Sequence, residues 1–189
     1  TIFGFAIKEL NTSAEDIEYF VPKLANNKKL VLPKPIHNLK KLSYEGSFVG
    51  LYNDFDVKGQ LNTAAGTLIC NSHIAIKNPL QYSGKISAQN FKLNEFFDQK
   101  IISKTSFDIQ LKGKGLSLSD LNLVFDGSLS NAIYNNYSYD KVNILGTFND
   151  KTLAINGNIE DKNLNLVYDS SIDLKEKDIS YSLDANINH

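Results

Sequence analysis

The chain has 189 residues, with 20 basic side chains against 21 acidic ones and a formal net charge of −1 at pH 7. All of the basic residues are lysine, so there is no guanidinium fork for phosphates or guanine edges, which argues against a nucleic-acid reader. A single cysteine and three histidines argue against a disulfide scaffold and a zinc module. The absence of methionine indicates a processed chain or a segment of a longer protein.

The first 42 residues (1–42) are predicted to form the end of a preceding block. Residues 2–7 suit a strand, and residues 12–24 suit a short helix with Ser13 as its N-cap and Pro22 near its end. Residues 25–41 carry five lysines around two prolines, which predicts an extended connector. Its lysines are either solvated or in contact with anionic lipid headgroups or an acidic partner.

Residues 43–189 are predicted to form a β-meander, because apolar residues recur at every second position. The alternation runs through residues 55–62, 68–77, 82–88, 107–113, 142–148, 153–159, 164–174 and 179–187. One apolar and one wet face per strand is typical of antiparallel sheets. The sequence therefore predicts an all-β fold of some ten antiparallel strands, with a further brief helical turn at residues 93–99.

Six glycines fall in phase with the apolar residues: Gly59, Gly84, Gly113, Gly127, Gly146 and Gly157. Their common phase fits either a sheet that curls toward its apolar side or the ordinary curvature of a sandwich. In either case the apolar side needs a cover. A second sheet layer, closure into a barrel, or an apolar ligand in a partly open sheet would each provide one.

No catalytic, cofactor-binding or metal-binding set emerges from the motifs. The sequence contains neither a phosphate-binding glycine loop nor a nucleophile elbow. His37 lies in the connector and His73 on a polar phase, where solvated histidines are expected. Cys70 falls on an apolar phase, as a small buried hydrophobe would. We therefore expect a protein that is not an enzyme and needs no cofactor.

Several short phrases resemble the AsmA/TamB superfamily, in particular the TamB-type translocation and assembly module proteins of Bacteroidetes. They are NTSAEDI at 11–17, LSYEGSFVGLYNDF at 42–55, NTAAG at 62–66, YSGKISAQNF at 82–91, GKGLSLSDLN at 113–122 and YSYDKV at 137–142. This resemblance implies a curved antiparallel meander shaped as a taco or half-pipe, with an apolar inner face. On that basis the chain would be an internal segment of a much longer protein.

The resemblance also implies a setting and partners. Such proteins are anchored in the inner membrane, span the periplasm and work with an outer-membrane barrel of the Omp85 type. They are thought to carry phospholipid between the membranes or to assist the assembly of outer-membrane barrels. Residues 43–189 would then be a groove segment that shields phospholipid acyl chains. The alternatives are a scaffold or chaperone for outer-membrane barrel proteins and a plain β-sandwich binding module.

The residues expected to line the groove are the in-phase apolar ones. They are Phe55, Val57, Leu61, Ile74, Ile86, Phe107, Ile109, Val142, Ile144, Phe148, Ile155, Ile159, Tyr181 and Leu183.

Overall fold

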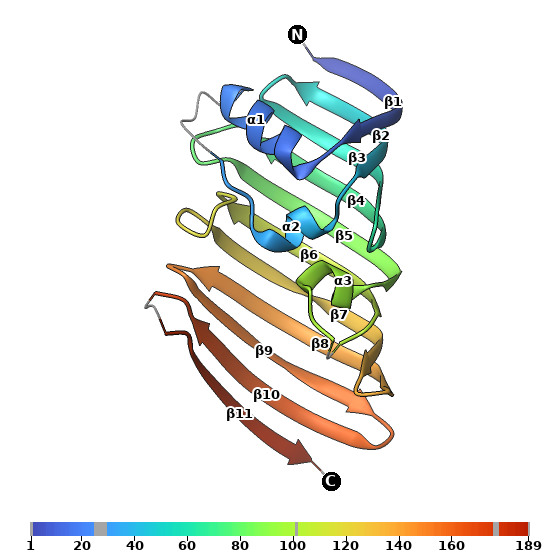
Figure 1. The fold of residues 1–189 in the computed structure, drawn as a ribbon, viewed down its shortest axis with the longest axis vertical. Coiled ribbons are helices and arrows are strands. Elements are labelled where there is room, and N and C mark those ends of the chain that lie inside the picture. The colour runs from blue at the N-terminus through green and yellow to red at the C-terminus, as the bar shows by residue number, and fades with distance from the viewer. Residues whose placement is uncertain (1, 25–29, 101, 176–177, 189) are drawn as a thin grey trace.

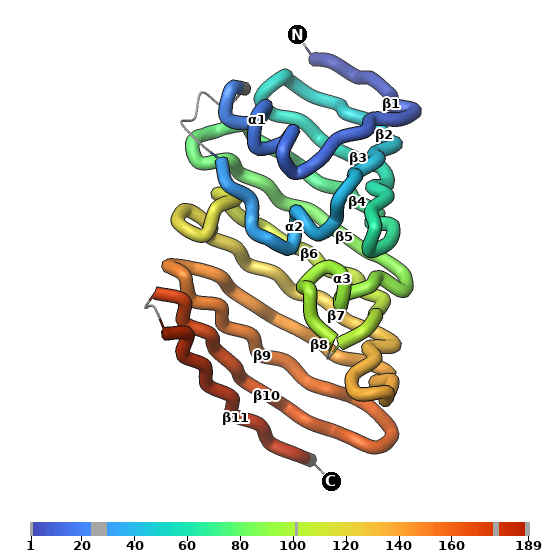
Figure 2. The backbone as a smooth tube through the Cα atoms, viewed as in Figure 1, coloured from blue at the N-terminus to red at the C-terminus, as the bar shows by residue number. Residues whose placement is uncertain are grey.

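Eleven antiparallel strands form one sheet in the computed structural model, which describes residues 2–24, 30–100, 102–175 and 178–188. The strands are β1 (Phe3–Thr12), β2 (Leu42–Leu51), β3 (Asp54–Thr63), β4 (Gly66–Ala75), β5 (Gln81–Phe91), β6 (Thr105–Lys114), β7 (Asn122–Tyr134), β8 (Tyr137–Asn149), β9 (Thr152–Asp161), β10 (Leu164–Asp173) and β11 (Ser180–Asn188). Each pairs with its neighbours in the sequence, so β1 and β11 are the edges (Figure 1). The sheet curls without closing into a barrel (Figure 2). The predicted all-β half-pipe is confirmed.

The register puts alternate residues of every strand on one side of the sheet. Tyr44 is opposite Leu61, Leu61 is opposite Leu68, and the row continues through Ala88 to Phe107. We call the side that carries this row the apolar face and the other side the polar face. The six glycines singled out in the sequence lie in phase with the apolar face.

Tight turns explain why the sheet is a meander. Two residues separate β7 from β8 and β8 from β9. Asn135 and Asn136 have φ values of 47° and 65°, and Asp150 and Lys151 have values of 49° and 59°. Positive φ at both central residues is what a type I′ turn requires, and its twist matches that of the flanking strands.

Three helices lie over the apolar face of the first strands (Figure 1). They are α1 (Ala14–Leu24), α2 (Lys34–Asn38) and α3 (Leu93–Phe97). Ser13 is the N-cap of α1, as predicted, because its Oγ accepts a hydrogen bond from the Asp16 N–H at 3.2 Å. The brief helical turn expected after β5 is α3.

The strand β1 extends to Thr12 rather than ending at residue 7, and the structure differs from the sequence prediction in two further elements. The connector contains α2, which carries a proline in its first turn. A proline there fits a helix because the first-turn N–H groups have no partner within the helix. The strand β7 was not among the alternating runs. Asn131 within it has a φ of 52°, and the pairing with β8 skips that residue, so the apolar phase is interrupted.

The buried core lies between the helices and strands β2–β6. Its buried members are Leu39, Leu42, Ala65, Ala88 and Phe91, and the half-buried residues packed against them are Ile17, Leu61, Leu68, Leu93, Phe96 and Phe107. By contrast, no residue of β9 or β10 is buried. In the described part of the chain, no helix lies over β9–β11 (Figures 1 and 2). The apolar face therefore has a covered part over β2–β6 and an open part over β9–β11.

Candidate functional site

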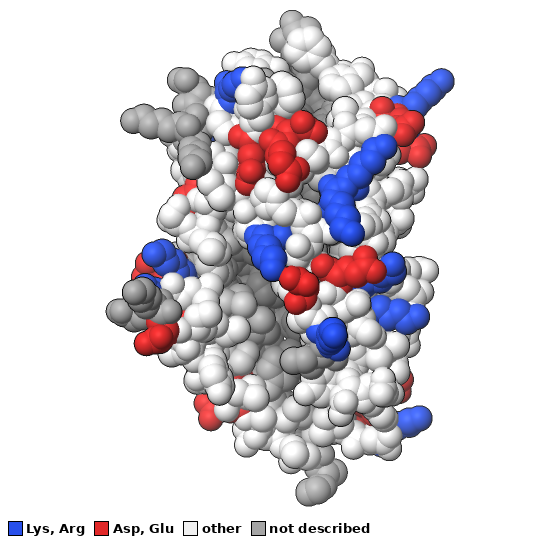
Figure 3. All heavy atoms as spheres, in the orientation of Figure 1, with Lys and Arg blue, Asp and Glu red and all other residues white. Residues whose placement is uncertain are grey.

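All fourteen residues predicted to line a groove lie on the apolar face. Cross-strand pairs connect them across the sheet. Phe55 faces Ile74, for example, and Val142 faces Ile159. Figure 3 shows this side of the molecule hollowed over the strands beside α3. The register thus brings the predicted residues together on one continuous surface, while their contact with a ligand stays a prediction.

The environments of these fourteen residues differ along the sheet. Leu61 and Phe107 pack under the helices as part of the core. Val57 and Phe148 are buried, at 7% and 6% exposure. Tyr181 and Leu183, on the edge strand β11, are 84% and 65% exposed. The remaining eight, which are Phe55, Ile74, Ile86, Ile109, Val142, Ile144, Ile155 and Ile159, are half-buried.

Glycines on the apolar face leave room for aromatic rings to lie flat on the sheet. A Cβ placed on Gly113 would lie 2.8 Å from the ring of Tyr82, and a Cβ on Gly146 would overlap the ring of Phe125. Each ring belongs to the residue paired with that glycine across the ladder. At these two positions the lack of a side chain leaves space for the neighbouring aromatic ring. The ring therefore lies against the sheet, and the apolar surface is not interrupted there.

An apolar hollow of about 310 Å³ opens at the β1 end of the same face. It is lined by Phe3, Phe5, Phe48, Phe55 and Ile76 among others. The Phe5 and Phe48 rings stack at 5.4 Å, and Phe48 lies 5.6 Å from Phe55. Of these residues only Phe55 was singled out from the sequence. Phe3 and Phe5 alternate along β1, and β1 pairs with the strand β2 that carries Phe48. This alternation is the signal in the sequence that points to the phenylalanines of the hollow.

The polar face carries ion pairs between neighbouring strands. Lys85 Nζ lies 2.7 Å from Asp108, and His73 contacts Asp54 at 3.2 Å and Asp56 at 3.0 Å. All of these side chains are well exposed, so each pair contributes little to stability. Among the described residues, no three His, Cys, Asp or Glu side chains are arranged to hold a metal ion. The polar face is a solvated surface.

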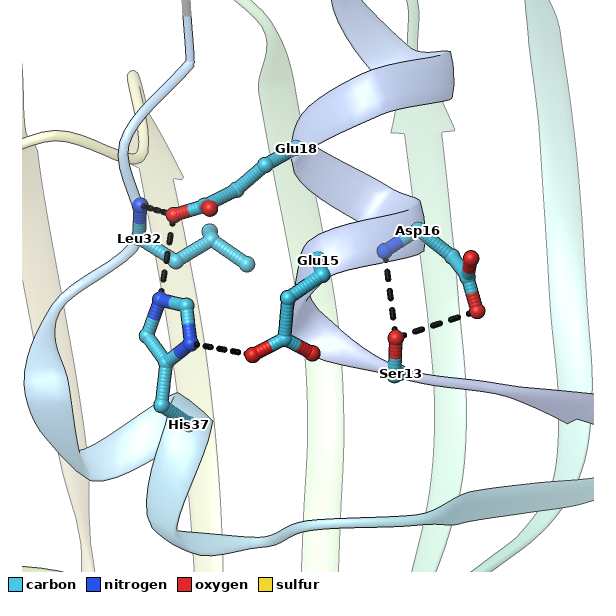
Figure 4. A network of polar contacts seen from close by, with 6 residues as sticks. All are labelled: Ser13, Glu15, Asp16, Glu18, Leu32 and His37. Atoms are coloured by element: carbon cyan, nitrogen blue, oxygen red, sulfur yellow. Dashed lines mark hydrogen bonds and ion pairs between the residues drawn. The ribbon is translucent and has the colours of Figure 1, made fainter.

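A polar cluster joins α1 to the chain that follows it (Figure 4). His37 Nδ1 lies 3.2 Å from Glu15 Oε1, and His37 Nε2 lies 3.1 Å from Glu18 Oε1. The same Glu18 oxygen accepts a hydrogen bond from the Leu32 N–H at 2.6 Å. Sequence reasoning took His37 for a solvated residue. The spacing of two glutamates one helical turn apart is the signal that points to a shared partner.

The hydrogen bonds of this cluster shift the pKa values of its members. Those to Glu15 and Glu18 raise the pKa of His37 above its ordinary 6.5. The Leu32 N–H lowers the pKa of Glu18 below 4.5, and backbone N–H donation at the start of α1 does the same for the pKa of Glu15. All three groups are therefore charged together in mildly acidic solution. Acidic side chains gather over α1 in Figure 3.

Cys70 is half-buried on the apolar face. Its Sγ lies 3.5 Å from the Gly59 carbonyl oxygen, and burial raises the pKa of the thiol. A raised pKa keeps the group protonated at neutral pH, so it lacks the thiolate character of a nucleophilic cysteine.

The comparisons with other proteins return no match. No protein-family model, curated protein or solved structure matches the chain. The resemblance to the AsmA/TamB superfamily therefore stays a prediction. In the part of the chain that the structure describes, every helix is too short or too polar to cross a membrane.

Proposed function

We propose that this chain is a non-enzymatic segment that shields the acyl chains of phospholipids on its apolar face. One observation carries the proposal. The rows of apolar side chains continue from the covered part of the face onto β9 and β10, where no residue is buried. The apolar side chains there, such as Ile155 and Leu166, are half-buried, and partly uncovered apolar surfaces of this kind are rare in soluble proteins unless a partner covers them.

The dimensions suit an acyl chain. A ten-residue strand such as β10 is about 33 Å long, whereas an acyl chain spans half of a bilayer core, about 15 Å. Each methylene removed from water stabilises the complex by about 0.8 kcal/mol. Because this free energy is non-directional, we expect weak selectivity among lipids, which suits a protein that passes them along.

The proposed setting follows from the family resemblance. The chain would lie in the periplasm as part of a longer protein of AsmA/TamB type anchored in the inner membrane. It would transport phospholipid between the inner and outer membranes. An outer-membrane barrel of the Omp85 type would bind other parts of that protein rather than this segment.

A matched pair of variants tests the lipid proposal. Leu166 lies on the apolar face of β10, and its neighbour Val167 lies on the polar face and is 45% exposed. Leu166→Asn should lower the amount of phospholipid that co-purifies with the protein several-fold, as measured by mass spectrometry of the extract. Val167→Asn should leave it unchanged. Equal lipid content in both variants, or none in the wild type, contradicts the proposal.

The open edge at β11 supports a second candidate, a scaffold for unfolded outer-membrane barrel strands. On β11, Tyr181, Leu183 and Ile187 are 84%, 65% and 64% exposed, and one side of the strand has no partner within the described residues. An edge of this kind can bind an extended segment by adding it as a further strand. A photo-crosslinker in β11 should then capture barrel proteins, whereas one at Leu166 captures lipid under the first proposal.

A further inference from the structure

The helix α1 is held on the apolar face by apolar packing and by few polar contacts, and its residues Ala14 (1% exposed) and Pro22 are buried. Ile17 packs against the core cluster, while Tyr19 and Phe20 are 59% and 56% exposed. Among the described residues, the side chains of α1 make polar contacts beyond the helix and its cap only with the Leu32 N–H and with His37. His37 is therefore the one side chain that ties α1 to α2 by polar contacts in this part of the chain.

The geometry of His37 requires a charged imidazole. Each ring nitrogen faces a carboxylate oxygen, at 3.2 Å for Glu15 and 3.1 Å for Glu18 (Figure 4). A neutral imidazole has one N–H and one lone pair, so it can donate to only one of these acceptors. Its lone pair would then face the other carboxylate without a proton between them. With both carboxylates ionised, only the imidazolium satisfies both contacts.

Other charged groups near this cluster have partners of their own. Lys34, on the same short helix as His37, pairs with Asp98 at the end of α3 at 2.8 Å. Asp16, on α1, accepts a hydrogen bond from Ser13. Ile17 packs against the apolar core cluster, whose buried members on the sheet include Leu42 and Ala88. The charge state of the cluster is thus set by Glu15, Glu18 and His37.

We propose that Glu15, Glu18 and His37 form a proton-dependent latch that holds α1 over the covered part of the apolar face. The raised pKa of His37 makes the contribution of the imidazolium complete below pH 6.5, and that contribution is lost as the pH rises through the folded-state pKa. The carboxylates contribute above pH 4.5 and lose their part as the pH falls through their lowered values. The latch is strongest between about pH 4.5 and 6.5 and loosens in alkaline solution.

Release of α1 would uncover the apolar residues beneath Ile17. The contacts of the latch do not depend on a ligand, but its use as a gate for lipid rests on the proposed lipid function. On that basis, lipid would reach the covered part of the face more readily at pH 8 than at pH 5.5. Because the pKa of His37 is raised in the folded protein, the ratio of latched to released α1 should fall as the pH rises through that value.

The test follows the methyl resonances of Ile17 by NMR from pH 5 to pH 8.5. In the wild type, they should shift with the same midpoint as the His37 ring. In His37→Gln, which cannot carry the charge, they should stay near their high-pH position throughout. In His37→Lys, which keeps the charge, they should stay near their low-pH position. His73→Gln is the matched control, because His73 also contacts two carboxylates but lies on the polar face.

The latch is refuted if the Ile17 transition persists unchanged in His37→Gln, disappears in His73→Gln, or is absent from the wild type. A second measurement separates the latch from the lipid proposal. Binding of a fluorescent phosphatidylcholine should rise from pH 5.5 to pH 8 in the wild type and stay constant in His37→Gln. If no lipid binds at either pH while Ile17 still follows His37, then the lipid proposal fails and the latch stands.

Discussion

Replacing Phe91 by alanine should destabilise the protein far more than replacing Ile155 by alanine. Phe91 is 3% exposed and its ring lies 5.9 Å from Phe96 and 5.6 Å from Phe107, between the helices and the sheet. Ile155 is half-buried on β9, where no residue is buried. The contrast arises because the Phe91 side chain has protein on both sides, whereas the Ile155 side chain contacts only the sheet.

The expected free energies follow from these surroundings. Loss of a buried phenylalanine side chain typically costs 3–5 kcal/mol through lost transfer free energy and an unfilled cavity, and we expect about 4 kcal/mol at Phe91. At Ile155 the missing side chain leaves no enclosed cavity, so we expect about 1 kcal/mol. With a urea dependence of about 2 kcal/mol/M, the unfolding midpoint would fall by about 2 M and about 0.5 M, respectively.

Urea unfolding followed by circular dichroism measures both changes on lipid-free protein. Equal losses at the two positions would refute the reasoning, because Ile155 would then have a protein cover that the structure does not show. A loss of less than about 1.5 kcal/mol at Phe91 would equally contradict the assigned core, since it falls below the usual range for a buried phenylalanine.

Three further predictions concern single sites. Gly146→Ala should lower the free energy of unfolding by about 1–3 kcal/mol, because the new methyl group overlaps the Phe125 ring. An unchanged thermal midpoint would contradict this close contact between Gly146 and the ring. Ser13→Ala removes the acceptor for the Asp16 N–H and should weaken α1 by about 1 kcal/mol, seen as faster amide exchange within α1 and not in β9. Burial raises the pKa of the Cys70 thiol, so at pH 8 it should react with a thiol reagent several-fold more slowly than free cysteine. The reaction should become faster as the pH rises. In denaturant its rate should match that of free cysteine. A wild-type rate equal to that of free cysteine at pH 8 would place the thiol in solvent.

The strands were predictable because their pattern is local. Alternation between apolar and polar residues repeats in β3, β4, β6 and β8–β10 with few interruptions, and each tight turn leaves only one antiparallel neighbour to pair with. The same alternation placed the fourteen candidate residues on one face. It could not reveal how much of that face the helices cover, because cover depends on where α1–α3 pack rather than on their own sequences.

The features that sequence reasoning missed depend on long-range contacts. His37 meets Glu15 and Glu18 only because α2 folds back beside α1. Phe5 and Phe48 stack only through the pairing of β1 with β2. The spacing of residues within one element marks a candidate face, but it does not say which residues of another element will meet that face. The helix α2 was missed for a simpler reason, since prolines near a helix start resemble those of an extended connector.

The most direct test of the central claim asks which side of the sheet contacts hydrocarbon. A photo-activatable amino acid is placed at Leu166 or, as the control, at Val167, and the protein is irradiated in the presence of phospholipid. The lipid account predicts adducts with acyl chains at Leu166 and none above background at Val167. Equal labelling at both positions, or none at Leu166 in a folded protein, would contradict it.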